Sequence, residues 1–141
     1  TLRDKDGAIC GEQTASAEEN KVFFELENVH LWQGVKDPYL YTASAELLEI
    51  EAVLDKVSAR FGCRRYEIHP EYPLRGVSRH QDRWGKGNAL SKEDHEEDMA
   101  LICEVGANTI RLAHYQHDQY FYDLCDERGM VIWAEIPYIS I

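Results

Sequence analysis

The sequence predicts two regions of different fold class, a β region followed by an α/β region with a parallel sheet. The α/β prediction rests on three short apolar stretches, at residues 74–78, 108–113 and 130–134, which alternate with two segments of helical periodicity. Right-handed crossovers make such strands parallel neighbours in one sheet. The β prediction rests on partly alternating apolar stretches in residues 1–62, separated by turn residues. We therefore expect part of a β-sandwich, followed by the first three strands and two helices of a (β/α)8 barrel.

The first region has the turn signals of antiparallel strands. Residues 4–7 (DKDG) form a turn sequence, and short strands at Leu2 and Ile9 flank it. Further strands are expected at residues 21–26, 39–48 and 52–57. Four or five strands are too few for a sandwich of the immunoglobulin type, which uses about seven. This region is therefore expected to be incomplete.

The first helix of the second region has signals at both ends. Ser91 with Asp94 has the spacing of a capping box, and Gly106 is placed to end the helix. The residues expected on its buried face are His95, Met99, Ile102 and Cys103.

The second helix is delimited in the same way. Asp118 is placed to cap its start and Gly129 to end it. The residues expected on its buried face are Phe121, Leu124 and Cys125. The strand that follows, at residues 130–134, is apolar throughout, as a strand covered on both faces requires.

Three parallel strands do not make a barrel, which needs eight β/α units and about 250 residues. Both regions look incomplete on the side away from their junction. We therefore expect a fragment that spans a sandwich–barrel boundary, with domains at residues 1–62 and 74–141 and a junction at residues 63–73.

The composition narrows the choice of partners. The net charge of −11, from 15 basic and 26 acidic residues, argues against nucleic acid, because phosphate binding needs clustered Lys and Arg. No apolar run is long enough to span a bilayer, so no membrane partner is expected. Cys10, Cys63, Cys103 and Cys125 lack the paired spacing of a metal site. Buried free thiols at Cys103 and Cys125 favour a reducing, cytoplasmic location.

A short parallel sheet also predicts self-association. Both of its edges lack a partner strand, and such edges pair with other chains. We therefore expect a homo-oligomer. The apolar residues expected on the uncovered inner face of the sheet are Val77, Ile110, Leu112, Val131 and Trp133.

Polar side chains follow each strand of the second region. Arg79 and His80 follow the first strand, His114 the second and Glu135 the third. The carboxyl ends of parallel strands meet at one edge of a sheet, which is where barrels hold their active sites. Arg111, inside the second strand, needs a carboxylate partner if it is buried, and Glu135 is the candidate. The sequence therefore predicts a ligand site at this edge.

Several long motifs, in the right order, resemble the β-galactosidase group of the family-two glycoside hydrolases. Residues 74–83 (LRGVSRHQDR), 110–115 (IRLAHY), 123–126 (DLCD) and 131–137 (VIWAEIP) resemble the first three strands and second helix of the TIM barrel. Residues 31–41 (LWQGVKDPYLY) and 60–62 (RFG) resemble the end of the immunoglobulin-like domain that precedes that barrel. The resemblance covers nearly the whole chain.

The resemblance implies a parent enzyme that hydrolyses terminal β-galactosides with retention of the anomeric configuration. Its two catalytic glutamates, about 5–5.5 Å apart in retaining enzymes, lie on later barrel strands, so the fragment is expected to contain no catalytic residue and to be inactive alone. His80 and His114 match histidines that contact the galactosyl hydroxyls. Arg111 matches the arginine beside the nucleophile. Glu135 is expected to contact these site residues without touching the sugar itself.

The resemblance also bears on cofactors. No cofactor is expected. A magnesium-dependent relative would have a carboxylate and a histidine where this chain has Ile139 and Ile141, so no metal site is expected. Residues 67–73 are shorter than the family junction, which usually includes a hairpin.

Three other functions remain open. A β-glucuronidase of the same family would take its distinguishing basic contacts from later strands. A barrel metallohydrolase would use His114, His117 and Glu135 as a two-histidine, one-carboxylate metal site. Alternatively, the piece is a structural module without a site of its own.

Overall fold

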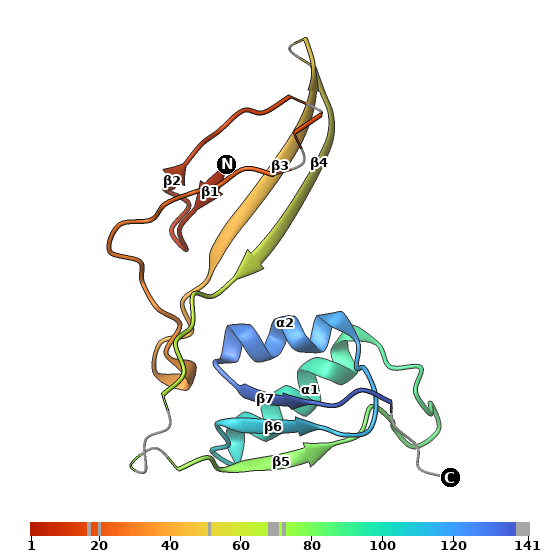
Figure 1. The fold of residues 1–141 in the computed structure, drawn as a ribbon. Coiled ribbons are helices and arrows are strands. Elements are labelled where there is room, and N and C mark those ends of the chain that lie inside the picture. Colours follow the sequence, from red (N-terminus) through yellow and green to blue (C-terminus); the bar gives the residue numbers. More distant parts are fainter. Residues whose placement is uncertain (17, 20, 51, 68–70, 72, 138–141) are drawn as a thin grey trace. The chain divides into compact units, whose positions relative to one another are not determined.

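The computed structural model describes the chain except residues 17, 20, 51, 68–70, 72 and 138–141. The expectations that depend on Ile139, Ile141 and residues 68–70 and 72 of the junction lie outside the described residues. The chain divides into two compact units (Figure 1). The N-terminal unit comprises Thr1–Trp32 and Tyr39–Arg65, and the C-terminal unit comprises Gln33–Pro38 and Tyr66–Ile141.

The N-terminal unit contains one antiparallel sheet in its described residues. Its strands, in the spatial order β2-β1-β3-β4, are β1 (Leu2–Arg3), β2 (Ile9–Gly11), β3 (Tyr41–Glu49) and β4 (Ala52–Phe61). The predicted turn between the first two strands is present, because Asp4 Oδ1 accepts the N–H groups of Asp6 and Ala8 at 3.0 and 2.8 Å. Strand β4 continues four residues beyond the predicted end at residue 57, to Phe61.

The predicted strand at residues 21–26 is wrong. The segment pairs with no strand, and it serves instead to cover a small core. Phe24 and Leu26 pack against that core, which consists of Leu2, Tyr39 and Tyr41. Alternation of apolar residues reports which side chains are covered, but strand formation also needs a neighbouring backbone to bond.

The C-terminal unit has the predicted β-α-β-α-β order. Its elements are β5 (Gly76–Arg79), α1 (Lys92–Glu104), β6 (Thr109–Leu112), α2 (Gln119–Arg128) and β7 (Val131–Ala134), with the 3-10 helix η1 (Gly34–Lys36) packed against them. The strands are parallel, in the order β5-β6-β7. Figure 1 shows both helices on one side of this sheet. The described part of the sheet is open, with β5 and β7 as its edges.

The predicted helix ends are confirmed. Ser91 Oγ accepts the Asp94 N–H, and the Asp94 side chain accepts the Ser91 N–H at 2.9 Å, which completes the capping box. Asp118 Oδ1 accepts the Tyr120 N–H at 2.8 Å at the start of α2. Gly129 ends α2 with a positive φ of 73°, a conformation that glycine adopts without steric cost.

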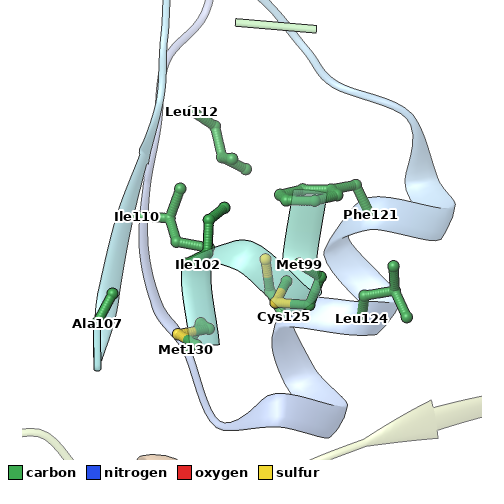
Figure 2. Close-up of a cluster of buried hydrophobic side chains, with 9 residues drawn as sticks. All are labelled: Met99, Ile102, Ala107, Ile110, Leu112, Phe121, Leu124, Cys125 and Met130. Carbon is green, nitrogen blue, oxygen red and sulfur yellow. The ribbon is translucent and has the colours of Figure 1, made fainter. Parts of the chain in front are cut away.

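The core of the C-terminal unit lies between the sheet and the two helices (Figure 2). Ile110, Leu112, Phe121 and Cys125 have no exposed surface there. The full cluster consists of Met99, Ile102, Ala107, Ile110, Leu112, Phe121, Leu124, Cys125 and Met130. Burial raises the pKa of the Cys125 thiol to about 12. Cys103 was expected beside this core, but it is exposed, because it lies one residue beyond Ile102 and so about 100° further around the helix.

The expected inner face of the sheet is also corrected. Strand alternation places Val77, Ile110 and Leu112 toward the helices and their core. The opposite face, which we call the open face, carries Trp133, whose side chain is 69% exposed. Strand β7 is therefore covered on one face only, and the expected list combined residues from two faces.

The expected self-association stays a prediction. No described helix has the length and apolar character needed to cross a membrane.

A close backbone contact joins η1 to the end of α2. A Cβ atom built on Gly129 would overlap the backbone of Gly34 and Val35. Gly106 ends the preceding helix with nearly the same φ, 74°, but a Cβ atom there would meet no atom within 4 Å. The two glycines therefore share one backbone conformation and differ only in their surroundings.

This difference gives a matched pair of variants. Gly106→Ala should lower the free energy of unfolding by about 1–2 kcal/mol, the cost of a left-handed conformation with a side chain. Gly129→Ala should cost about 2–4 kcal/mol, because overpacking against η1 adds to the same backbone term. Urea unfolding of both variants measures the difference. Equal losses would contradict a tight contact between η1 and α2.

Candidate active site

The two histidines that follow β5 and β6 lie together at the carboxyl edge of the sheet. The ring centroids of His80 and His114 are 4.8 Å apart, with an interplanar angle of 64°. Both side chains are exposed. The structure therefore brings together the two residues predicted to contact a sugar, and their rings are open to a ligand.

Glu135 joins this pair from the end of β7. Its Oε2 accepts the backbone N–H of His114 at 2.6 Å, and its Oε1 accepts from Arg111 Nε at 2.7 Å. The predicted pairing of Arg111 with Glu135 is therefore present. The His114 N–H and the Arg111 guanidinium hold the pKa of Glu135 below its usual range. Glu135 is thus a charged acceptor at neutral pH, which anchors two neighbouring residues.

Arg111 lies on the open face, between residues of the two adjacent strands. The strand register pairs it with Ser78 on β5 and with Trp133 on β7. All three side chains are exposed. A hydroxyl, a guanidinium and an indole in one row, beside the His80–His114 pair, provide donors and an apolar ring surface, as carbohydrate binding requires.

Arg79 does not belong to this edge, contrary to the expectation that grouped it with His80. It has the same parity on β5 as Val77, so its side chain enters the helix layer, where it is only 6% exposed. Asp98 Oδ2 accepts from its Nε at 2.9 Å and from its Nη2 at 2.7 Å. The guanidinium carbon also lies 3.8 Å from the ring centroid of Phe121. A buried charge needs such partners, since an unpaired one would be very costly.

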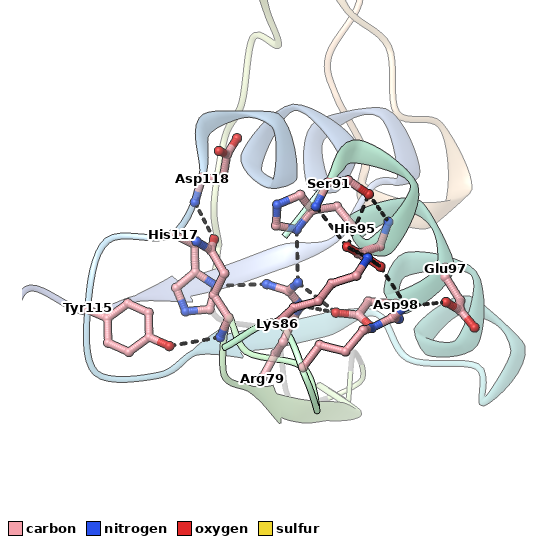
Figure 3. Close-up of polar contacts among 12 residues, drawn as sticks. Arg79, Lys86, Ser91, His95, Glu97, Asp98, Tyr115, His117 and Asp118 are labelled. Carbon is pink, nitrogen blue, oxygen red and sulfur yellow. Dashed lines mark hydrogen bonds and ion pairs between the residues drawn. The ribbon is translucent and has the colours of Figure 1, made fainter. Parts of the chain in front are cut away.

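Two buried histidines complete the surroundings of Arg79 (Figure 3). Its Nη2 donates to His95 Nδ1 at 3.0 Å, and its Nη1 donates to His117 Nδ1 at 3.2 Å. Because a guanidinium can only donate, both Nδ1 atoms are acceptors and both rings are neutral. Burial, followed by the positive charge of Arg79, lowers the pKa of His95. Burial also lowers the pKa of His117, with Arg79 contributing.

A second polar cluster fixes the segment between β5 and α1. Asp94 is 4% exposed and accepts from Lys86 Nζ at 2.7 Å and from Arg83 at 2.8 Å. The Lys86 ammonium is the main reason why the pKa of Asp94 lies well below its usual range. The same carboxylate closes the capping box of α1, so the loop after His80 is tied to the start of that helix.

The alternative metal site does not assemble. His117 is 3% exposed, and both of its ring nitrogens are engaged, one with Arg79 and the other with the carbonyl oxygen of Ala113. It is therefore unable to join His114 and Glu135 as a ligand in this arrangement. Within the part of the chain that the structure describes, no group of three His, Cys, Asp or Glu side chains is placed to hold a metal ion.

The sequence matches two profiles of one enzyme family. The profile described as "Glycosyl hydrolases family 2, TIM barrel domain" matches residues 69–141, and the one described as "Glycosyl hydrolases family 2" matches residues 2–64. The chain belongs to glycosyl hydrolase family 2. The family expected from the motifs is thereby confirmed.

Relatives of this family-2 chain carry two activity names. A β-glucuronidase of Bacteroides fragilis is 44% identical over 124 residues, which cover 82% of this chain and 18% of that protein. The β-galactosidase large subunit of Lactobacillus helveticus is 34% identical over 79% of this chain and 19% of that subunit. The crystal structure of an FMN-binding β-glucuronidase from Facaelibacterium prausnitzii L2-6 is 43% identical, with a TM-score of 0.90, over 99% of this chain and 23% of that one. The family-2 chain thus spans about a fifth of the length of these relatives.

Sequence reasoning missed the cluster around Arg79. Two signals point to it. Arg79 shares its strand parity with Val77, which predicts a side chain directed toward the helices. Asp98 follows His95 by three residues, which places both on one helical face beside the buried Met99. A carboxylate and a histidine on a buried face together indicate a buried cationic partner.

The neutral histidines predict a specific pH dependence of stability. Their pKa values in the folded chain lie below the ordinary value of 6.5, so below about pH 6.5 the unfolded chain binds more protons than the folded one. Stability should be fully present above that pH and should fall as the pH drops through the folded pKa values. Urea unfolding at about pH 7.5 and about pH 5.5 measures this fall before most carboxylates titrate.

A double variant supplies the control for this prediction. His95→Gln with His117→Gln removes both titrating rings and keeps a neutral polar side chain at each position. Its stability should change less between the two pH values, even if it is lower overall. An equal pH dependence in the double variant would assign the effect to other groups.

Proposed function

We propose that this chain is part of a retaining β-glucuronidase, in which His80 and His114 contact the hydroxyl groups of the bound sugar. The observation that carries the proposal is that two relatives by sequence at more than 40% identity are named β-glucuronidase or putative β-glucuronidase, as is the Facaelibacterium structure at 43%. The site supports it, since the two histidines lie at the carboxyl edge of a parallel sheet, where barrel enzymes bind substrate. The sequence motifs alone favoured β-galactosidase, and the relatives favour the alternative.

The chemistry of hydrolysis would come from two glutamates on later strands of the family barrel. In a retaining enzyme one protonates the leaving oxygen while the other forms the glycosyl intermediate. The residues of this chain would bind and orient the sugar. Imidazole can donate or accept a hydrogen bond, so His80 and His114 can each bind a sugar hydroxyl that acts as acceptor or as donor. Hydrogen bonds from these histidines that strengthen as the sugar ring flattens in the transition state would raise kcat.

Arg111 would act beside the nucleophile. Its Nε is already bonded to Glu135, and its side chain remains 44% exposed, so the rest of the guanidinium is accessible from the open face. A guanidinium near a nucleophilic carboxylate keeps that carboxylate ionised. Because Arg111 already has a carboxylate partner, the cation that would recognise the carboxylate of a glucuronide is expected on a later strand.

β-Galactosidase remains the second candidate. It is favoured by the motifs at residues 74–83 and 110–115, by the Lactobacillus helveticus relative and by the structure of a putative β-galactosidase from Bacteroides fragilis, which is 42% identical. FMN enters neither candidate, because the two-glutamate mechanism has no redox step. The binding of FMN is a property of one relative, the Facaelibacterium prausnitzii enzyme.

A substrate comparison tests the proposal. The full-length protein should hydrolyse a chromogenic β-glucuronide with a kcat/KM at least about 100-fold above that for the matching β-galactoside, because a site built around a substrate carboxylate discriminates against a sugar that lacks it. The 141-residue chain alone should hydrolyse neither compound. A preference for the galactoside would establish the second candidate instead.

The two histidines give a second test. In the full-length enzyme, His80→Ala and His114→Ala should each lower kcat/KM by about 10²–10³-fold, comparable to the loss of a transition-state donor, with little change in thermal stability. His30→Ala, in the N-terminal unit, is the control and should leave the kinetics nearly normal. If the site variants instead melt at lower temperature and retain normal kinetics, the two histidines are structural.

A further inference from the structure

The peptide group between Ala113 and His114 is bonded at both of its polar atoms. The Ala113 carbonyl oxygen accepts from His117 Nε2 at 3.3 Å. The His114 N–H donates to Glu135 Oε2 at 2.6 Å. His114 itself has a φ of +74°, a region that residues other than glycine rarely occupy and that persists only where the surroundings enforce it. The two bonds are the contacts that would enforce it.

The carbonyl end of this peptide depends on Arg79 through His117. Arg79 Nη1 donates to His117 Nδ1, which leaves the ring proton on Nε2, the atom that faces the Ala113 carbonyl. The Arg79 main-chain oxygen also accepts the Ala113 N–H at 3.0 Å. Ala113 is therefore held to Arg79 at two points, one direct and the other through the imidazole.

The N–H group of the 113–114 peptide is held from the open face of the sheet, by the carboxylate of Glu135. Glu135 is fixed by Arg111 Nε at 2.7 Å. Asp98, Arg79, His117, the 113–114 peptide, Glu135 and Arg111 thus form one continuous series of polar contacts. The series runs from helix α1 to the end of β5, then past the ends of β6 and β7, and returns to β6 at Arg111.

We propose that Arg79 and His117 are positioning residues for His114. They fix the 113–114 peptide from the buried side while Glu135 fixes it from the open side, and together these contacts hold the His114 ring beside His80. The link from this geometry to sugar binding rests on the proposed function. We call the two hydrogen bonds that hold the 113–114 peptide, from His117 and to Glu135, the clamp. The clamp is a property of the fold and is testable without any substrate.

His95 provides a matched control within the same cluster. It is as buried as His117, at 2% against 3% exposure, and its Nδ1 accepts from the same guanidinium at a similar distance. Among the described residues no hydrogen bond joins His95 to Ala113, whereas His117 makes one. His95→Leu and His117→Leu therefore each remove one neutral acceptor from Arg79, although Nη2, which bonds His95, also donates to Asp98. Only the second variant releases the Ala113 carbonyl, and His117→Gln separates that loss from the loss of an acceptor for Nη1.

The first experiment measures the clamp directly. Hydrogen exchange with mass spectrometry on the full-length protein should show that His117→Leu speeds exchange in the segment 113–117 by at least about 10-fold, through local opening. His95→Leu should leave this segment close to wild type. His117→Gln, whose amide can still donate toward the Ala113 carbonyl, should restore much of the protection.

The second experiment measures the consequence for catalysis with the glycoside that the full-length enzyme hydrolyses. His117→Leu should lower kcat by about 10–100-fold and change KM by less than about 3-fold, the pattern expected when a transition-state contact is misplaced. His95→Leu should retain most of kcat, and His117→Gln should recover part of it. The melting temperature of each variant shows how much stability it has lost.

The outcomes distinguish failure of the peptide contacts from failure of the proposed function. If the two leucine variants lose protection and kcat equally, the cluster only stabilises the fold and the positioning role is wrong. If exchange in the segment 113–117 is unchanged in His117→Leu, the clamp itself is wrong. If exchange changes as expected but the protein hydrolyses no glycoside, the clamp stands and the proposed function fails.

Discussion

The buried charge of Arg79 is the constraint on which the rest of the C-terminal unit depends. A guanidinium in a water-excluded layer must be neutralised and hydrogen-bonded, and one partner seldom suffices. Asp98 supplies the charge, His95 and His117 supply neutral acceptors, and Phe121 supplies an aromatic face. These partners come from α1, from α2 and from the loop after β6. Satisfying one side chain therefore ties both helices to the carboxyl edge of the sheet.

Features encoded over a few residues could be predicted from the sequence. The helix ends followed from Ser91, Asp118 and the two glycines, because capping bonds join near neighbours and need no knowledge of the fold. The pairing of Arg111 with Glu135 was also accessible, since parallel strands of similar length bring their carboxyl ends together. The position of His80 beside His114 required only the strand order.

Features that depend on parity or on distant partners could not be predicted by the same reasoning. Arg79 and His80 are adjacent in sequence, yet one enters the helix layer and the other stays exposed, since successive strand residues point to opposite faces. Trp133 was assigned to the face of Ile110 because composition alone does not give the register. Residues 21–26 alternate as a strand does. Whether such a segment joins a sheet depends on an unpaired strand edge nearby in space, and the local sequence does not show whether one is present.

The contact between Gly34 and Gly129 has a consequence for the order in which the chain folds. The segment Gln33–Pro38 lies early in the sequence, but it belongs to the C-terminal unit, which is otherwise built from residues after Arg65. During synthesis from the N-terminus this segment emerges long before α2 ends at Gly129. Contacts between residues so distant in sequence form late and slow folding. The C-terminal unit is therefore discontinuous, and the contact of Gly34 with Gly129 closes a loop of the chain that contains β3 and β4 of the other unit.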